Sequence, residues 1–148
     1  MNKYTLGRQI AVAARVWRGE LDKRLFPHSL SQARYALLTL LAEAQGPLPQ
    51  NDLAERAGIS GPTLVRQLDQ LEHAGLVRRR DSPDDRRVKH ICITAAGREA
   101  YGTARSIAED LRKEVTSPVP DEDLVQLQKT LAVLIQQLDL IRLSDNAK

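Results

Sequence analysis

The stretch QNDLAERAGISGPTLVRQLDQLEHAG, residues 50–75, has the spacing of a helix-turn-helix. Gly58 suits the left-handed residue that ends a helix, and Ser60 suits the N-cap of the helix that follows. Pro62 then falls in the first turn of that second helix, where no amide donor is needed. The stretch therefore predicts a short helix over residues 50–57, a tight turn, and a second helix that ends near Ala74.

The second of these helices has one apolar face and one polar face. Leu64, Leu68 and Leu71 recur at helical spacing and should face a core. On the opposite face, arginine can read guanine and glutamine can read adenine in a major groove. The backbone amides at the start of the helix suit a phosphate. The candidate residues of this helix are Ser60, Gly61, Pro62, Thr63, Arg66, Gln67 and Gln70.

The next stretch, RRRDSPDDRRVKHICIT (residues 78–94), places two arginine clusters on either side of an acidic turn, followed by an alternating strand. Like charges that face each other across a hairpin repel, and a polyanion would relieve that repulsion. A hairpin after a helix-turn-helix predicts a winged helix, whose tip arginines can enter a minor groove while Asp84 and Asp85 orient them. The strand residues would lie within reach of phosphates. The candidates here are Arg78, Arg80, Asp85, Arg86, Arg87 and Lys89.

Both ends of the chain are expected to be helical. Apolar residues at spacings of three and four predict helices over residues 5–25 and 31–45, from Thr94 onward, and over residues 124–141. Neither terminal stripe has enough neighbours within one chain, and unburied stripes mark interfaces, so a symmetric dimer is expected. The first stripe comprises Leu6, Ile10, Ala14, Trp17, Leu21 and Leu25, and the last comprises Leu124, Leu127, Leu131, Leu134, Leu138 and Ile141.

The expected fold is therefore mainly α with a small β-hairpin wing. The 148 residues fit one domain, in which residues 31–97 form the winged helix-turn-helix lobe and residues 1–30 and 98–148 form a helical dimerisation region. The net charge of +3 points weakly to a nucleic-acid partner. One cysteine, no signal-like N-terminus and no long apolar run indicate a cytoplasmic protein without a membrane partner.

The two basic stretches together resemble one family. GISGPTLVRQLDQLEHAGLVRR (58–79) and DRRVKHICITAAG (85–97) resemble the MarR-family transcriptional regulators, and within them the SlyA type. The second stretch has the family's Asp-x-Arg wing signature followed by a hydrophobic-Thr-x-x-Gly helix start, and LGRQIAVAARVWRGELDKRL near the N-terminus is also similar. The residues that match the signature are Asp85, Arg87, Ile93, Thr94 and Gly97. Pro49 departs from the family, which often has a Ser or Thr cap there.

The resemblance implies a homodimer that binds double-stranded DNA at a pseudo-palindrome, with recognition helices about 34 Å apart. Arg66 would touch bases in the major groove, and Arg87 would enter the minor groove while Asp85 holds it. Many members bind small aromatic carboxylates such as salicylate, which weakens DNA binding. The matching pocket residues are Arg15, Trp17, Arg18, Tyr35 and Thr39, although Trp17 fits equally well as a core residue.

Three other functions agree less well with the sequence. A redox-sensing regulator would act through Cys92, but a single cysteine lacks the resolving partner that such a thiol needs. A winged helix used only for protein interaction is opposed by the basic wing. An enzyme, a metal site and a cofactor are not expected. The three histidines (His28, His73, His90) lie far apart, and no catalytic or zinc-binding pattern stands out.

Overall fold

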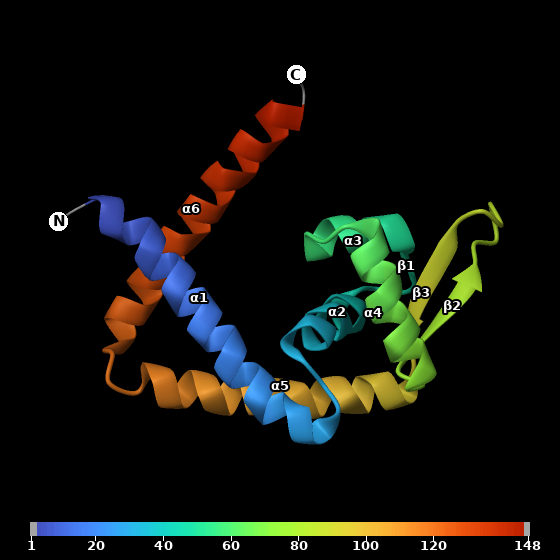
Figure 1. The fold of residues 1–148 in the computed structure, drawn as a ribbon, viewed down its shortest axis with the longest axis horizontal. Coiled ribbons are helices and arrows are strands. Elements are labelled where there is room, and N and C mark those ends of the chain that lie inside the picture. The colour runs from blue at the N-terminus through green and yellow to red at the C-terminus, as the bar shows by residue number, and fades with distance from the viewer. Residues whose placement is uncertain (1–2, 147–148) are drawn as a thin grey trace. The chain divides into compact units, whose positions relative to one another are not determined.

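A computed structural model describes residues 3–146 of the chain, in two compact units, Met1–Glu109 and Asp110–Lys148. Helices dominate both units, and the strands all belong to the first (Figure 1). The elements are α1 (Lys3–Leu25), η1 (Phe26–His28), α2 (Gln32–Glu43), β1 (Leu48–Pro49), α3 (Gln50–Ala57), α4 (Gly61–His73), β2 (Val77–Asp81), β3 (Lys89–Ile93), α5 (Ala95–Thr116) and α6 (Asp121–Asn146).

The helices around the expected helix-turn-helix begin and end where local signals place them. The Ser31 hydroxyl accepts a hydrogen bond from the Arg34 amide at 3.2 Å and so caps α2. Ser60 caps α4 in the same way. Gly58 ends α3 with φ of 65°, in the left-handed region that favours glycine. Pro49 precedes α3 and offers no side-chain cap, as its sequence suggested.

Leucines from three helices form the core of the first unit. α2 contacts both α3 and α4, and all three helices contact strands of the sheet. The inward-facing leucines of α4 are no more than 1% exposed, which confirms the helical periodicity predicted for this segment. The buried hydrophobic residues of these elements are Leu37, Leu38, Leu41, Leu48, Leu53, Leu64, Leu68, Leu71, Val77 and Ile91.

The wing is a three-stranded antiparallel sheet in the order β1-β3-β2, and not only a hairpin. The extra strand, β1, pairs Leu48 with Ile91 and Pro49 with His90. Two residues that include a proline give no alternating pattern, so this strand depends on its pairing with β3 rather than on local propensity. β1 ties the segment between α2 and α3 to the base of the wing.

The boundaries of three elements differ from the expected ones. α2 ends at Glu43, two residues before Gln45, and Asp81 belongs to β2 rather than to the loop. The return strand spans Lys89–Ile93, so Val88 and Thr94 lie outside it. Val88 lies outside because its amide donates to the carbonyl of Asp85 within the wing loop, and Thr94 lies outside because it caps α5.

The start of α5 is bound tightly to the loop before β2. The Thr94 hydroxyl donates to the Gly75 carbonyl at 2.6 Å and accepts from the Gly97 amide at 3.0 Å. The Thr94 amide donates to the Leu76 carbonyl at 3.1 Å. A Cβ on Gly97 would lie 2.0 Å from the carbonyl oxygen of Leu76, so the backbones approach more closely than any side chain permits. This contact explains the Thr-x-x-Gly pattern physically.

Gly97→Ala should therefore destabilise the fold by about 1–3 kcal/mol, because the added methyl group forces a backbone shift. Gly102→Ala is the matched control, since a Cβ at Gly102 meets nothing within 4 Å and alanine favours the helix by about 1 kcal/mol. Urea unfolding at one fixed protein concentration measures both changes. Equal free energies of unfolding for the two variants would contradict the close approach at Gly97.

The terminal helices leave much of their apolar surface uncovered. In α1 the stripe is buried only at its C-terminal half, where Leu21 is 3% exposed, whereas Leu6 is 44% exposed. In the second unit Leu138 is 65% exposed. Val115, the last residue but one of α5, is 51% exposed. No helix within residues 3–146 combines the length and the hydropathy that a membrane span requires.

Candidate nucleic-acid interface

α4 presents a polar face beside the wing. Arg66 is exposed in the second turn of the helix, and Thr63 is half-buried one turn before it. The leucines that alternate with them are fully buried, so the orientation of the helix is fixed by its core face. An exposed arginine near the start of such a helix is placed where helix-turn-helix proteins contact base edges.

The first turn of α4 offers fewer free amides than the sequence suggested. Pro62 has no N–H, and the Thr63 amide already donates to the Ser60 hydroxyl at 3.3 Å. The Ser60 hydroxyl in turn donates to the Thr63 hydroxyl at 2.9 Å. Gly61 is exposed between them. Fewer backbone amides are therefore available to bind a phosphate at this helix end than the sequence predicted.

The two glutamines of α4 lie in different environments: Gln70 is exposed, as its place on the outer face predicted, and Gln67, predicted on the flank, is less so. Gln67 is half-buried, and its Oε1 is buried without a hydrogen-bond partner in the described part of the chain. Gln70 accepts a hydrogen bond from Arg34 Nη2 at 2.7 Å. Arg34 also donates to the Ser29 carbonyl at 3.0 Å, so it bridges the start of α2 to the C-terminal half of α4. Gln70 thus makes a hydrogen bond to α2 while its side chain stays exposed.

The wing loop is closed by its own backbone and by Ser82. The Ser82 amide donates to the Val88 carbonyl at 2.9 Å, and the Asp84 amide donates to the Ser82 hydroxyl at 3.3 Å. Ser82 is only 7% exposed although it lies in a surface loop. The sequence signal for this turn is a serine next to Pro83, a pairing that is common in turns. The closed loop presents the residues that come after Ser82 at the tip of the wing.

Arg87 is held at the tip by Asp85. Its Nε donates to Asp85 Oδ1 at 3.1 Å and its Nη2 donates to Oδ2 at 3.2 Å, while its own amide also donates to Oδ1 at 3.0 Å. The Arg87 side chain is nevertheless 91% exposed. These bonds from the Arg87 side chain and amide lower the pKa of Asp85, so this carboxylate stays ionised to a lower pH than an unperturbed aspartate does.

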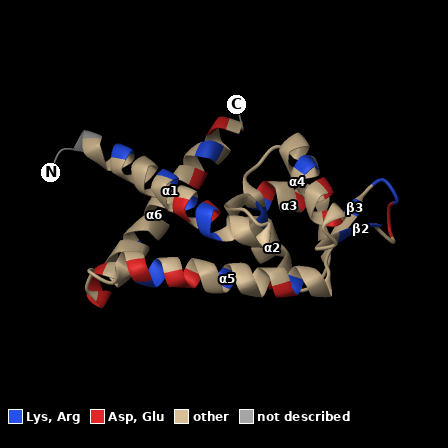
Figure 2. Cartoon of the chain, turned by 60° about the horizontal axis from the view of Figure 1, so that its bottom comes forward, with Lys and Arg blue, Asp and Glu red and all other residues tan. Residues whose placement is uncertain are grey.

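The strands of the wing alternate the directions of their arginines. Arg78 and Arg80 are exposed, whereas Arg79 between them is half-buried. Lys89 forms an ion pair with Asp81 across the two strands. Arg86 is exposed in the loop, where basic and acidic segments adjoin (Figure 2). The exposed basic residues of the wing are thus Arg78, Arg80, Arg86, Arg87 and Lys89.

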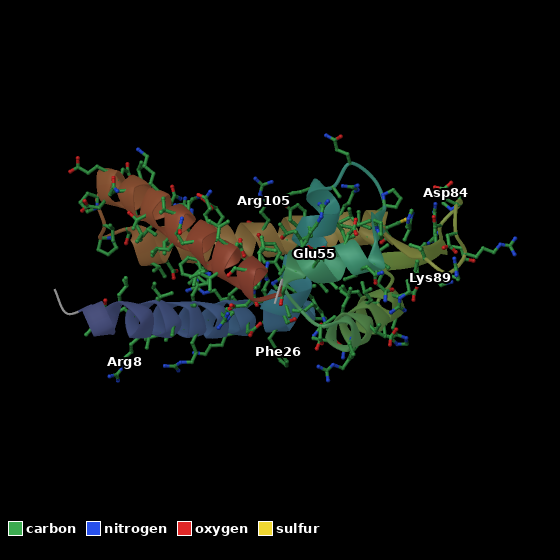
Figure 3. The ribbon with its side chains drawn as sticks, turned by 90° about the horizontal axis from the view of Figure 1, so that it is seen from above. Arg8, Phe26, Glu55, Asp84, Lys89 and Arg105 are labelled. Carbon is green, nitrogen blue, oxygen red and sulfur yellow. The ribbon has the colours of Figure 1, made fainter. Side chains whose placement is uncertain are left out.

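Two polar residues at the start of α3 belong to the same surface, and sequence reasoning missed them. Gln50 and Asn51 line a small pocket of about 110 Å³ together with Arg87, Val88 and Lys89. Figure 3 labels Lys89 and Asp84 on this wing. The available signal was the position of Gln50 and Asn51 in the first turn of a helix, where amides and short polar side chains favour anions.

The residues that were expected to bind an aromatic carboxylate divide into two groups. Trp17, Tyr35 and Thr39 line one pocket of about 430 Å³, whereas Arg15 and Arg18 are exposed on α1 and are not among its lining residues. The arginine that lines the pocket is Arg56, which sequence reasoning missed because it lies in the short α3.

Tyr35 forms one wall of that pocket. Its ring stacks on Tyr101, with centroids 6.2 Å apart, and its carbonyl accepts from the Thr39 hydroxyl at 2.9 Å. Burial raises the pKa of Tyr35, so its hydroxyl stays protonated at neutral pH. An apolar wall, one neutral hydroxyl and one arginine are suited to a planar anion.

Cys92 is half-buried on β3 and pairs in register with Arg78. Within residues 3–146, no cluster of three or more His, Cys, Asp or Glu side chains could hold a metal ion.

The chain is similar to known regulators over most of its length. The sequence profile of the MarR family matches residues 30–89, which contain the helix-turn-helix and most of the wing. The crystal structure of transcriptional regulator PA3341 is 38% identical, with a TM-score of 0.79, over 90% of this chain and 97% of that one.

Two further structures are similar at lower identity. AbsC, a MarR family transcriptional regulator from Streptomyces coelicolor, is 27% identical with a TM-score of 0.82, over 93% of this chain and 94% of that one. The transcriptional repressor CouR, bound to a 23-mer DNA duplex, is 27% identical with a TM-score of 0.82, over 88% of this chain and 92% of that one. Together with the winged helix described above, these matches show that the chain belongs to the MarR family of transcriptional regulators.

Proposed function

We propose that the protein is a sequence-specific regulator that binds double-stranded DNA as a homodimer at a pseudo-palindromic operator. The observation that supports it best is the exposed, ion-paired fork of Arg87 at the tip of a wing that adjoins the exposed Arg66 face of α4. A guanidinium held in this way suits a narrow minor groove, and Arg66 suits a guanine in the major groove. The related repressor CouR was solved on a DNA duplex, which supports DNA binding by this chain as well.

The dimeric state rests on exposed apolar surface. Large aliphatic side chains remain uncovered along α6 and along the N-terminal half of α1, and a second copy of the chain would cover them. In this proposal residues 31–97 form the DNA-binding lobe, and residues 1–30 and 98–148 form the dimerisation region. We keep the SlyA type as part of the proposal, on the N-terminal sequence similarity, together with a cytoplasmic location that fits a regulator acting on DNA.

A small aromatic carboxylate is the ligand class that the larger pocket favours. Trp17 and Tyr35 would flank a ring, and Arg56 would pair with its carboxylate, while Arg15 and Arg18 lie outside the pocket lining. CouR from Rhodococcus jostii RHA1 was solved with p-coumaroyl-CoA, an aromatic acyl compound. Binding in a pocket lined by α1, α2, α3 and α5 would weaken DNA binding by favouring another arrangement of these helices.

The alternatives make different predictions about salt. A protein-interaction module would bind its partner with little salt dependence, whereas phosphate contacts release counterions. A redox sensor acting through Cys92 would lose DNA affinity on oxidation, yet Cys92 is half-buried and is the only cysteine of the chain. Membership of a family of DNA-binding transcriptional regulators supports a role in regulation rather than in catalysis.

The experiment that tests the proposed function is a titration of the purified protein with duplex from its own upstream region. We expect tight binding that survives unrelated competitor DNA and whose logarithm falls linearly with the logarithm of salt concentration, with a slope of about −0.9 per phosphate contact. Salicylate should lower the affinity in the same assay. Binding abolished equally by unrelated DNA would remove the main support for a specific regulator.

A further inference from the structure

Arg79 stands in the middle of the arginine run of β2 but faces the recognition helix. Successive residues of a strand point to opposite sides, so Arg78 and Arg80 share one face while Arg79 lies on the other. Its cross-strand partner is Ile91, which is fully buried. The Arg79 side chain is 21% exposed, in contrast to its exposed neighbours. Its position therefore differs from that of the basic surface that a nucleic acid would meet.

The guanidinium of Arg79 binds three residues along one face of α4. Nη1 donates to Glu72 Oε2 at 2.8 Å, and Nη2 donates both to Asp69 Oδ1 at 2.6 Å and to the Val65 carbonyl at 3.2 Å. The Arg79 amide adds a bond to Glu72 Oε1 at 3.0 Å. Residues 65, 69 and 72 are spaced by four and three, so they form one row along two turns of the helix.

The charges of this cluster argue against a phosphate contact by Arg79. Two carboxylates, Asp69 and Glu72, surround one guanidinium, so the cluster has a formal charge of −1. A phosphate that approached Arg79 would meet both carboxylates and would have to displace existing charge-assisted bonds. The exposed arginines on either side carry no such cost. Arg79 is therefore placed to connect α4 to β2, and not to meet DNA.

We propose that Arg79 is a positioning residue that sets the angle between the recognition helix and the wing. The planar guanidinium reaches a backbone carbonyl and two carboxylates at once, a geometry that a lysine or an apolar side chain cannot reproduce. Because this link fixes the orientation of α4 relative to the wing, Arg66 and Arg87 would enter the two grooves in one fixed relative orientation. The inference rests on the proposed DNA-binding function and adds to it a residue that acts on specificity without touching the nucleic acid.

The test compares Arg79→Met with Arg80→Met, which removes the same charge from the exposed face of the same strand. For each variant, affinity for the operator and for an unrelated duplex is measured over a range of salt concentrations. We expect Arg79→Met to lower the ratio of operator to unrelated affinity roughly tenfold, the size of one misaligned bidentate base contact, with an unchanged salt slope. We expect Arg80→Met to reduce the slope by about 0.9 for each phosphate that is no longer neutralised and to leave the ratio unchanged.

A second variant keeps the test decisive if Arg79→Met does not fold. Asp69→Asn combined with Glu72→Gln preserves shape but removes the two charges that hold Arg79. Glu55→Gln on α3 measures the effect of removing one negative charge elsewhere on the same lobe, and twice that effect is the comparison for the double variant. If Arg79 positions the helix, the double variant loses specificity. If Arg79 instead binds phosphate, freeing it should strengthen binding to all duplexes and steepen the slope, which would overturn the proposal.

Two further results would also overturn it. One is a fall in salt slope for Arg79→Met equal to that for Arg80→Met. The other is an unchanged specificity ratio in folded Arg79→Met, which would leave Arg79 as a residue of stability alone. Circular dichroism at the assay temperature establishes that each variant is folded. The wild-type titration is read first. If the wild-type protein does not distinguish the operator from unrelated DNA, the result contradicts the proposed function itself rather than the role of Arg79.

Discussion

Arg87→Ala should weaken binding to every duplex, whether or not it contains the operator. The Arg87 side chain is 91% exposed and makes its described ion pair only with Asp85 of the same loop, so its loss leaves the core intact. A charge-assisted hydrogen bond contributes about 1.5–3 kcal/mol, which corresponds to roughly a tenfold to hundredfold loss of affinity for each wing. The salt slope should also become shallower by about 0.9 for each phosphate that the variant no longer neutralises. Fluorescence anisotropy with a labelled operator over a range of salt concentrations measures both effects.

Arg66→Ala provides the contrast, because the two arginines belong to different surfaces. It should chiefly erode sequence preference, by about 1–3 kcal/mol at one base pair, with little change for unrelated duplexes.

Asp85→Asn tests the ion pair between Asp85 and Arg87: it removes the charge that orients Arg87 while keeping Arg87 in the chain. We expect it to weaken binding less than Arg87→Ala does. Equal binding by Arg87→Ala and wild type at low salt would show that the wing does not take part.

The helix-turn-helix could be predicted from the sequence because its signals are local. Ser60, Gly58 and Pro62 each act on the backbone of their own turn, and the leucines of α4 repeat at the period of a helix. The β2–β3 hairpin of the wing was equally predictable, since an acidic turn between two basic, β-rich segments favours a hairpin, whereas β1 carries no local signal. The Asp85–Arg87 pair joins residues two positions apart, and so it too lies within the reach of sequence reasoning.

What the sequence did not reveal depends on contacts between distant segments. Gln70 is exposed, as predicted, but its hydrogen bond to Arg34, which lies 36 residues away, depends on the packing of α2 against α4. Arg56 enters the aromatic pocket through the placement of α3. Arg79 is the intermediate case. Alternation along β2 could have separated it from its neighbours, but its three acceptors on α4 require the tertiary structure.

The largest effect is expected from a charge placed on the apolar stripe of α6. Leu138 is 65% exposed in the single chain, so Leu138→Glu should leave the packing within that chain unchanged. In the proposed dimer the same side chain would be buried, and an unpaired carboxylate in an apolar interface is costly to desolvate. We expect the variant to sediment as a 16.5 kDa monomer where wild type sediments as a dimer. Its unfolding midpoint should fall and lose its dependence on protein concentration.

Loss of the dimer should reduce operator affinity far more than loss of one arginine does. A monomer binds one half-site, whereas in a dimer the second recognition helix binds at the effective concentration set by the first, which can add a factor of about 10²–10⁴. Gln136→Glu is the matched control: it adds one negative charge two residues away, about 200° around the same helix. It should remain dimeric and bind the operator normally. If Leu138→Glu stays dimeric, or if Gln136→Glu dissociates equally, the stripe that includes Leu138 is not the interface.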